Sequence, residues 1–275
     1  MTTDIVQKIT KAKAVLRGAI CGDIIGSCYE FYSTKNFNFE LLNKHSRFTD
    51  DTVCSIAVAD ALLSNRPFDY MFQKWCRKYF RAGYGPAFRR WIVLDNPVPY
   101  NSWGNGSAMR VSPTGAVATS IGEAMEISAQ SALVTHNHPE GVKGAQSVAV
   151  AIFMALDGAT KDEIKDFIEN QFGYDLSRDY EDIKAAYAFD VSCQGSVPEA
   201  IIAFLGSDDY ESAVRRAVAL GGDADTQGAI TGSIAAAYYG YIPEYILDEC
   251  LNRIPTEMSD VIIEFDNLLE EKHGR

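Results

Sequence analysis

A chain of 275 residues with 47% hydrophobic composition can bury a large core, and it fits one sizeable domain or two small ones. Its formal net charge of −12 argues against nonspecific binding to a nucleic-acid backbone, which needs a basic face. No apolar stretch approaches the length of a membrane span, and lysines interrupt residues 1–20, unlike a signal peptide. We therefore expect a soluble, cytoplasmic protein with a single domain over residues 1–275 and no membrane partner.

The spacing of apolar residues is helical along most of the chain. Apolar side chains recur at three- and four-residue steps in residues 5–20, 53–61 and 148–156, and clear alternating strands are absent. The pattern predicts an all-α fold. Six scattered cysteines form no CxxC pair and lie mostly in apolar contexts, so we expect reduced core residues. They are Cys21, Cys28, Cys54, Cys76, Cys193 and Cys250.

Glu30 is the first residue along the chain that is a candidate for a chemical role. It follows Gly22-Asp23-Ile24-Ile25-Gly26 in a segment that is otherwise apolar and aromatic. A carboxylate in such surroundings has a raised proton affinity, which is useful for handling water. The alternative is a glutamate exposed at a helix end.

Residues 95–107 are rich in proline, glycine and asparagine, which is typical of a surface loop that bends around a ligand. Its last four residues, Gly104-Asn105-Gly106-Ser107, precede a predicted helix, where backbone amides favour phosphate. Taken alone, the motif is as consistent with an ordinary turn. His136 and His138 follow at two-residue spacing, but no third nitrogen or sulfur ligand accompanies them. We interpret them as substrate-contacting or loop-ordering residues.

The last long helical segment has glycine or alanine at every fourth position: Gly228, Gly232, Ala236 and Gly240. Glycine lowers helix stability, so this stripe indicates a buried central helix that a neighbour approaches closely.

Two short acidic clusters, Thr49-Asp50-Asp51-Thr52 and Gly221-Gly222-Asp223-Ala224-Asp225-Thr226, each open an apolar helix. Carboxylates packed together repel one another, so cations must neutralise them or their pKa values must rise. Aspartate and threonine offer only oxygen, which points to Mg²⁺, Mn²⁺ or Ca²⁺ rather than zinc or copper. The pair of clusters predicts one divided site for two ions.

One simpler interpretation of these clusters stays open, and a second fails. Thr49 or Asp50 can act only as the N-cap of the helix that starts near Val53. The second cluster matches the first half of an EF-hand loop, but Ile234 stands at the twelfth position, where that loop requires a glutamate.

Taken in order, five segments of the chain resemble the ADP-ribosylglycohydrolases, which are related to the dinitrogenase-reductase-activating glycohydrolase. The segments are Arg17-Gly18-Ala19 through Gly22–Gly26 to Glu30, Phe48–Thr52, Gly104–Arg110, Thr135–Pro139 and Gly221–Thr226. Their joint order makes the resemblance specific.

The resemblance implies a compact all-α fold with a binuclear Mg²⁺ or Mn²⁺ centre. It implies cleavage of the bond between the anomeric carbon of ADP-ribose and an acceptor, either an ADP-ribosylated protein side chain or a small ADP-ribose conjugate. Glu30 would orient or deprotonate the attacking water. The implied metal ligands are Thr49, Asp50, Asp51, Asp223, Asp225 and Thr226. The implied substrate contacts are Gly104, Asn105, Gly106 and Ser107 at the diphosphate and distal ribose, and His136 at the ribose.

Two other classes of function remain open from the sequence. One is a non-catalytic ADP-ribose-binding or structural protein on the same fold, against which the clustered acids argue. The other is a metal-dependent nucleotide phosphoesterase, which a binuclear oxygen-ligand centre also suits. The acceptor linkage, the proton donor to the leaving group, the physiological metal and the oligomeric state do not follow from the sequence.

Overall fold

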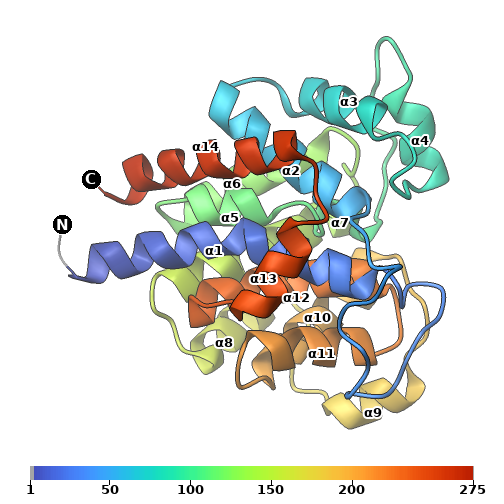
Figure 1. Ribbon diagram of the computed structural model, residues 1–275, viewed down its shortest axis with the longest axis vertical. Helices are drawn as coiled ribbons and strands as arrows, with labels where there is room; N and C mark the ends of the chain where they lie inside the picture. The colour runs from blue at the N-terminus through green and yellow to red at the C-terminus, as the bar shows by residue number, and fades with distance from the viewer. Residues whose placement is uncertain (1–2, 275) are drawn as a thin grey trace.

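Helices form nearly all the regular structure of the computed structural model, which describes residues 3–274 (Figure 1). In this range there is no strand, and one isolated bridge joins Gly104 to Ser192. The predicted all-α fold is thereby confirmed. The helices of the first half are α1 (Thr3–Gly26), α2 (Asp50–Ser64), α3 (Phe68–Lys78), α4 (Pro86–Ile92), the 3-10 helix η1 (Asn105–Ser107), α5 (Ser112–Val117), α6 (Ile121–Leu133) and α7 (Pro139–Leu156). Those of the second half are α8 (Lys161–Phe172), α9 (Tyr180–Ala186), α10 (Cys193–Leu205), α11 (Tyr210–Ala219), α12 (Ala224–Tyr239), α13 (Glu244–Leu251) and α14 (Thr256–His273).

Helices α1 and α12 pack side by side along most of their length near the centre of the molecule (Figure 1). A Cβ atom on Gly22 would lie 2.0 Å from the carbonyl oxygen of Gly228, and one on Gly18 would lie 2.5 Å from that of Gly232. The two backbones therefore touch, as the small-residue stripe predicted. Because Gly26 meets Ala224 at the other end of this contact, α1 and α12 run antiparallel. The carboxyl end of α1 thus meets the amino end of α12.

Gly240 also faces α1, where a Cβ atom on it would lie 2.7 Å from Cγ of Lys11. However, helix α12 ends at Tyr239, and Gly240 adopts a left-handed conformation with φ of 68° as its C-cap, donating its N–H to the carbonyl of Ala236. The expectation that Gly240 lies within the helix is therefore wrong. A glycine at the first residue beyond a helix is favoured because it has no Cβ to strain the left-handed backbone.

The six cysteines are free thiols, five of them buried and Cys28 half-buried, in line with the expected core positions. Across residues 3–274, none of the helices combines the length and the apolar character that crossing a membrane requires.

Candidate active site

Asp23, near the carboxyl end of α1, organises the amino end of α2. Its carboxylate accepts the backbone N–H groups of Thr49 at 2.9 Å and Thr52 at 3.1 Å. It also accepts the hydroxyl of Thr49 at 2.7 Å and that of Thr52. The first amides of a helix have no partner within the helix, and here a carboxylate from another helix binds them. Asp23 is not among the site residues predicted from the sequence, although an acid between glycine and isoleucine in an apolar helix was the available signal.

Thr49 is the N-cap of α2, and its side chain accepts the N–H of Asp51. The N-cap interpretation therefore holds for Thr49, and α2 begins at Asp50, earlier than the predicted start near Val53. The same threonine hydroxyl lies 3.2 Å from a carboxylate oxygen of Asp51. Thr49 can therefore cap α2 and also lie beside the acids, because the cap is at the point where α1 and α2 meet.

The two acidic clusters come together in space with Asp23 and Glu30. Carboxylate oxygens of Asp23, Asp51 and Asp225 lie within 4.8 Å of one another, and so do those of Glu30, Asp223 and Asp225. Asp225 belongs to both groups, since it stands in the first turn of α12 where that helix meets α1. The five carboxylates form a continuous acid wall, which we define as Asp23, Glu30, Asp51, Asp223 and Asp225.

Burial and mutual repulsion raise the proton affinity of this wall. Burial, and next the charge of Asp225, raise the pKa of Asp23 to about 7, and the same causes raise the pKa of Glu30 to about 8. The pKa values of Asp51 and Asp223 also rise well above their ordinary range, chiefly because of burial. In addition, Oδ1 of Asp51 is buried with no hydrogen-bond partner among the described residues. An isolated group of this kind is unfavourable until a cation or protons neutralise it.

Asp50 and Thr226 extend the acid wall at its edges. Asp50 is half-buried, and it lies so close to the backbone at Gly83 that a Cβ atom there would be 2.9 Å from its Oδ1. Gly83 has φ of 125°, a conformation that other residues rarely adopt. Thr226 is buried beside Asp225, whose carboxylate accepts its N–H at 3.0 Å.

A cavity of about 370 Å³ opens over the acid wall. Glu30, Asp51, Asp223 and Asp225 line one side of it, and Gly104, Asn105, Gly106, Arg110 and His136 line another. The predicted metal-ligand and substrate residues therefore border one cavity, with two exceptions. Thr49 lies beneath it against Asp23, and the hydroxyl of Ser107 turns away to donate to the carbonyl of Gly141 at 2.7 Å.

Asn105 connects the glycine-rich loop to the acid wall. Its side-chain amide donates to Oδ2 of Asp223 at 2.7 Å, and its backbone N–H donates to the carbonyl of Val191. The hydrogen bond to Asn105 lowers the pKa of Asp223 and so opposes the effect of burial. Asn105 thus fixes a carboxylate in addition to lining the cavity.

His136 is held in one protonation state by its neighbours. A guanidinium N–H of Arg110 donates to the hydroxyl oxygen of Thr135 at 2.9 Å, and that hydroxyl lies 2.7 Å from Nδ1 of His136. Among residues 3–274, Nδ1 is the one acceptor within reach of the Thr135 hydroxyl, so we assign the ring proton to Nε2. Burial, and next the charge of Arg110, lower the pKa of His136 well below its usual range. The ring is therefore neutral, with an Nε2–H donor.

The glycines of the loop make room for this ring. A Cβ atom on Gly106 would lie 3.2 Å from Nε2 of His136, and one on Gly104 would lie 3.6 Å from it. His138 has a different role, because its Nδ1 accepts the N–H of Glu140 and caps α7. The interpretation of His138 as a loop-ordering residue is therefore confirmed.

Arg110 is almost fully buried, and no carboxylate of residues 3–274 pairs with it. Its guanidinium lies 4.1 Å from the ring centroid of Phe72 and 5.8 Å from that of Phe88, and it donates to the carbonyl of Ser131. Aromatic faces and neutral oxygens stabilise this buried cation in place of a salt bridge. We define Arg110, Thr135 and His136 as the basic wall of the cavity.

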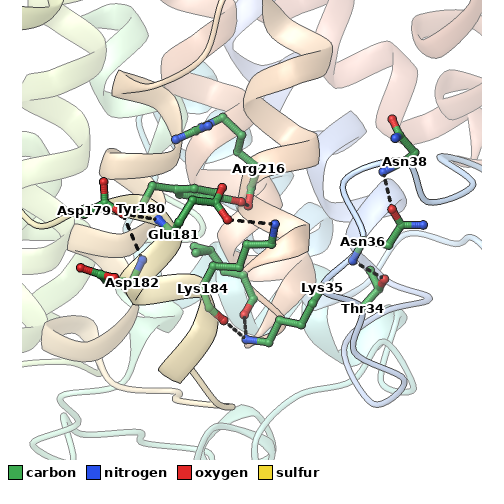
Figure 2. Close-up of polar contacts among 11 residues, drawn as sticks. Thr34, Lys35, Asn36, Asn38, Asp179, Tyr180, Glu181, Asp182, Lys184 and Arg216 are labelled. Atoms are coloured by element: carbon green, nitrogen blue, oxygen red, sulfur yellow. Dashed lines mark hydrogen bonds and ion pairs between the residues drawn. The ribbon is translucent and has the colours of Figure 1, made fainter.

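The loop that carries Glu30 is fastened to the rest of the molecule by Lys35. Figure 2 shows its ammonium reaching the end of α9, where it donates to the carbonyls of Lys184 at 2.7 Å and Tyr187 at 2.8 Å. A third bond goes to the carbonyl of Leu220, directly before the acidic cluster of α12. Lys35 thus ties the segment after Glu30 to the segment before Asp223, a contact with no signature in the sequence.

Comparison with known proteins identifies the family. The family model for ADP-ribosylglycohydrolase matches residues 4–274. The chain therefore belongs to the ADP-ribosylglycohydrolase family and is a hydrolase, as the order of its motifs indicated.

Particular relatives are similar over most of their length. The human protein "ADP-ribosylhydrolase ARH3" is 25% identical over 331 residues, covering 89% of this chain and 90% of the relative. "ADP-ribosylarginine hydrolase Tri1" of Pseudomonas putida is 24% identical over 313 residues, covering 98% of this chain and 83% of the relative. A solved structure titled "ADP-ribosylglycohydrolase-related protein complex" superposes with a TM-score of 0.72 at 24% identity, over 96% of this chain and 99% of the other, and confirms the fold.

Proposed function

We propose that this chain is a metal-dependent hydrolase that cleaves the bond between the anomeric carbon of ADP-ribose and an acceptor. The observation that carries the proposal is the convergence of carboxylates from three separate segments on one cavity that His136 also lines. These carboxylates are Glu30, Asp50, Asp51, Asp223 and Asp225. The names of the relatives support ADP-ribose as the substrate half. An ADP-ribosylated protein side chain or a small ADP-ribose conjugate would fill the cavity.

The acid wall fits divalent cations. The donor set is oxygen alone, and two groups of acids share Asp225. Oδ1 of Asp51 is buried with no partner in the part of the chain that the structure describes. Such a set suits Mg²⁺ or Mn²⁺, and the two groups favour two ions. The residues that would hold them are Thr49, Asp50, Asp51, Asp223, Asp225 and Thr226, together with Asp23. When bound, the ions would supply Lewis-acid stabilisation of the ribose hydroxyls.

Glu30 is the residue of this wall placed to act on water. It lines the cavity, it is half-buried, and its loop is fixed by Lys35. Added positive charge beside it would lower its raised pKa, so that it could accept a proton from the attacking water near neutral pH. Water would then add at the anomeric carbon as the bond to the acceptor breaks. The proton that Glu30 takes from the water would pass, directly or through solvent, to the departing acceptor.

The remaining cavity residues would bind the substrate and orient it. Backbone at Gly104 and Gly106 would border the diphosphate and distal ribose, Asn105 would hold both Asp223 and substrate, and His136 would donate from Nε2 to a ribose oxygen. Because these groups are fixed before substrate arrives, they would align the anomeric carbon with Glu30 at little entropic cost.

Product analysis tests the proposal. The purified protein would be incubated with Mg²⁺, with Mn²⁺ or with EDTA on arginine- and serine-linked ADP-ribosyl proteins, ADP-ribosylated bases and O-acetyl-ADP-ribose, with mass spectrometry of the products. We expect metal-dependent release of intact ADP-ribose from at least one of these substrates. Release of AMP would instead indicate attack on the diphosphate, and binding of ADP-ribose with no release from any substrate would contradict the hydrolase.

A further inference from the structure

One stretch of this acidic protein is strongly basic. Residues 66–91 contain seven lysines and arginines and a single acid, Asp69, which gives a net charge of +6. Since the whole chain has a formal net charge of −12, the remaining residues carry −18. The basic stretch comprises α3, α4 and the loop between them, which form the upper right corner of Figure 1.

A second cavity lies against this stretch, with a volume of about 450 Å³. Its lining is next to that of the active-site cavity along the chain, because Ala82 lines the second cavity and Gly83, which lies close to Asp50, lines the first. The residues that line the second cavity are Arg47, Phe48, Lys78, Tyr79, Phe80, Arg81 and Ala82. Cations and aromatic rings thus alternate in its lining.

Several cations of this stretch already have partners. Lys78 pairs with Glu257, Lys74 pairs with Asp60, and the guanidinium of Arg89 lies 4.7 Å from the ring centroid of Phe80. Arg47 and Arg81 are exposed, and within residues 3–274 their side chains enter no ion pair and no hydrogen bond. These two guanidinium groups are therefore available to an anionic partner.

Arg47 lies within electrostatic reach of Glu30, because its charge lowers the pKa of Glu30. The basic stretch also continues along the chain into the active-site cavity. Arg81 and Ala82 line the second cavity with Arg47, and Gly83, the next residue, lines the active-site cavity. A polypeptide whose modified residue occupies the active-site cavity would therefore have its flanking residues near Arg47 and Arg81.

We propose that Arg47 and Arg81, with the rings of Phe48, Tyr79 and Phe80, form a basic shelf that binds acidic residues flanking the modified residue of an ADP-ribosylated polypeptide. This inference rests on the proposed function and names its acceptor class. Guanidinium groups bind carboxylates with two parallel hydrogen bonds, and the rings between them cover the apolar parts of a peptide. A nucleic-acid backbone fits less well, because the rest of the surface is strongly acidic and would repel a long polyanion.

The test uses ADP-ribosylated peptides that differ only in their flanking residues, which are two glutamates, two glutamines or two lysines, each made with an arginine and with a serine linkage. Binding is measured by calorimetry at low and high salt on the Glu30→Gln variant, so that hydrolysis does not interfere. We expect the glutamate-flanked peptide to bind about tenfold more tightly than the lysine-flanked peptide, and salt to reduce the difference.

Arg81→Glu should reverse this order of affinities while leaving the affinity for free ADP-ribose unchanged. Arg66→Glu is the matched control, since Arg66 is an exposed arginine of the same stretch that lines neither cavity, and it should preserve the wild-type order. Equal affinity for all three peptides would overturn the basic shelf. Binding of free ADP-ribose in the same experiment would still support the proposed function. Competition by a short oligonucleotide but not by a glutamate-rich peptide would also overturn it. Failure of ADP-ribose itself to bind would contradict the proposed function instead.

Discussion

The two walls of the cavity bury opposite charges, and these charges are stabilised in different ways. On the basic wall, the buried charge of Arg110 is stabilised by the rings of Phe72 and Phe88 and by neutral oxygens, and His136 is kept neutral. On the acid wall, burial and repulsion raise the pKa values of the carboxylates, and Oδ1 of Asp51 has no partner among the described residues. The protein itself stabilises the buried charge of the basic wall, although Nε of Arg110 has no partner among the described residues, whereas the acid wall needs added positive charge.

This difference predicts which residues, when changed, should alter the response of the protein to divalent cations. Changes on the acid wall should alter activity and the response of stability to divalent cations together. Changes on the basic wall should alter substrate affinity and leave the response to cations intact.

The largest effect should come from Asp225→Asn, because Asp225 is common to both groups of acids. We expect kcat/KM to fall by at least about 1000-fold. In EDTA the variant should have a thermal midpoint equal to or above that of the wild type, since one repelling carboxylate is gone. Glu264→Gln, an exposed acid on α14, is the control and should change neither quantity. Retention of a tenth of the wild-type activity would contradict the metal role of Asp225.

Stability of the metal-free protein should depend on pH with a definite sign. The pKa of Asp23 is about 7 in the folded chain, against an ordinary value of 3.8. Between these pH values the folded chain retains a proton that the unfolded chain has released. The free energy of unfolding therefore decreases as pH rises from about 4 to 7. Thermal midpoints measured in EDTA should fall over this range, and saturating Mn²⁺ should remove the fall. A midpoint that rises with pH in EDTA would oppose the account.

Asn105 joins the glycine-rich loop to the acid wall, so its loss should affect catalysis as well as binding. Asn105→Ala removes the donor to Asp223, and we expect kcat/KM to fall about 30-fold, with changes in both kcat and KM. Asn105→Asp should lower kcat/KM further than Asn105→Ala does, because it adds a carboxylate to the acid wall. Steady-state kinetics of both variants tests this order, and an effect confined to KM would show that Asn105 acts on substrate alone.

The smallest effect is expected on the basic wall, from Thr135→Val. The change removes the hydroxyl between Arg110 and His136 without altering the size of the side chain. Affinity for ADP-ribose should fall about tenfold, with metal affinity unchanged, and Thr135→Ser should restore it. Nitrogen-15 spectra of the histidine rings should place the proton of His136 on Nε2 in the wild type. A proton on Nδ1 would refute the assignment of the donor.

Periodicity was sufficient to predict the helical fold, and motif order indicated candidate site residues, most of which line one cavity. Apolar residues at helical spacing mark α1, α2 and α7, and the stripe of Gly228 and Gly232 marks the contact between α1 and α12. These signals are local or depend on one helix face. Gly240 was misassigned because a glycine at fourfold spacing can equally be the residue that ends the helix, and periodicity alone does not distinguish the two.

The residues that position the site were not predictable. Asp23 acts through the amino end of α2, and Lys35 binds three carbonyl groups from two other segments. Their importance depends on which helix ends meet in space, and backbone carbonyls have no signature in a sequence. The same holds for the partners of Ser107 and Asn105, which the fold brings together from distant parts of the chain.

The most direct test of the central claim, that the acid wall binds two divalent cations, is an anomalous difference map from a crystal grown or soaked with Mn²⁺. The account predicts two peaks on either side of Asp225, one beside Asp51 and one beside Asp223. Crystals in millimolar Mn²⁺ that show no peak at these carboxylates would contradict it.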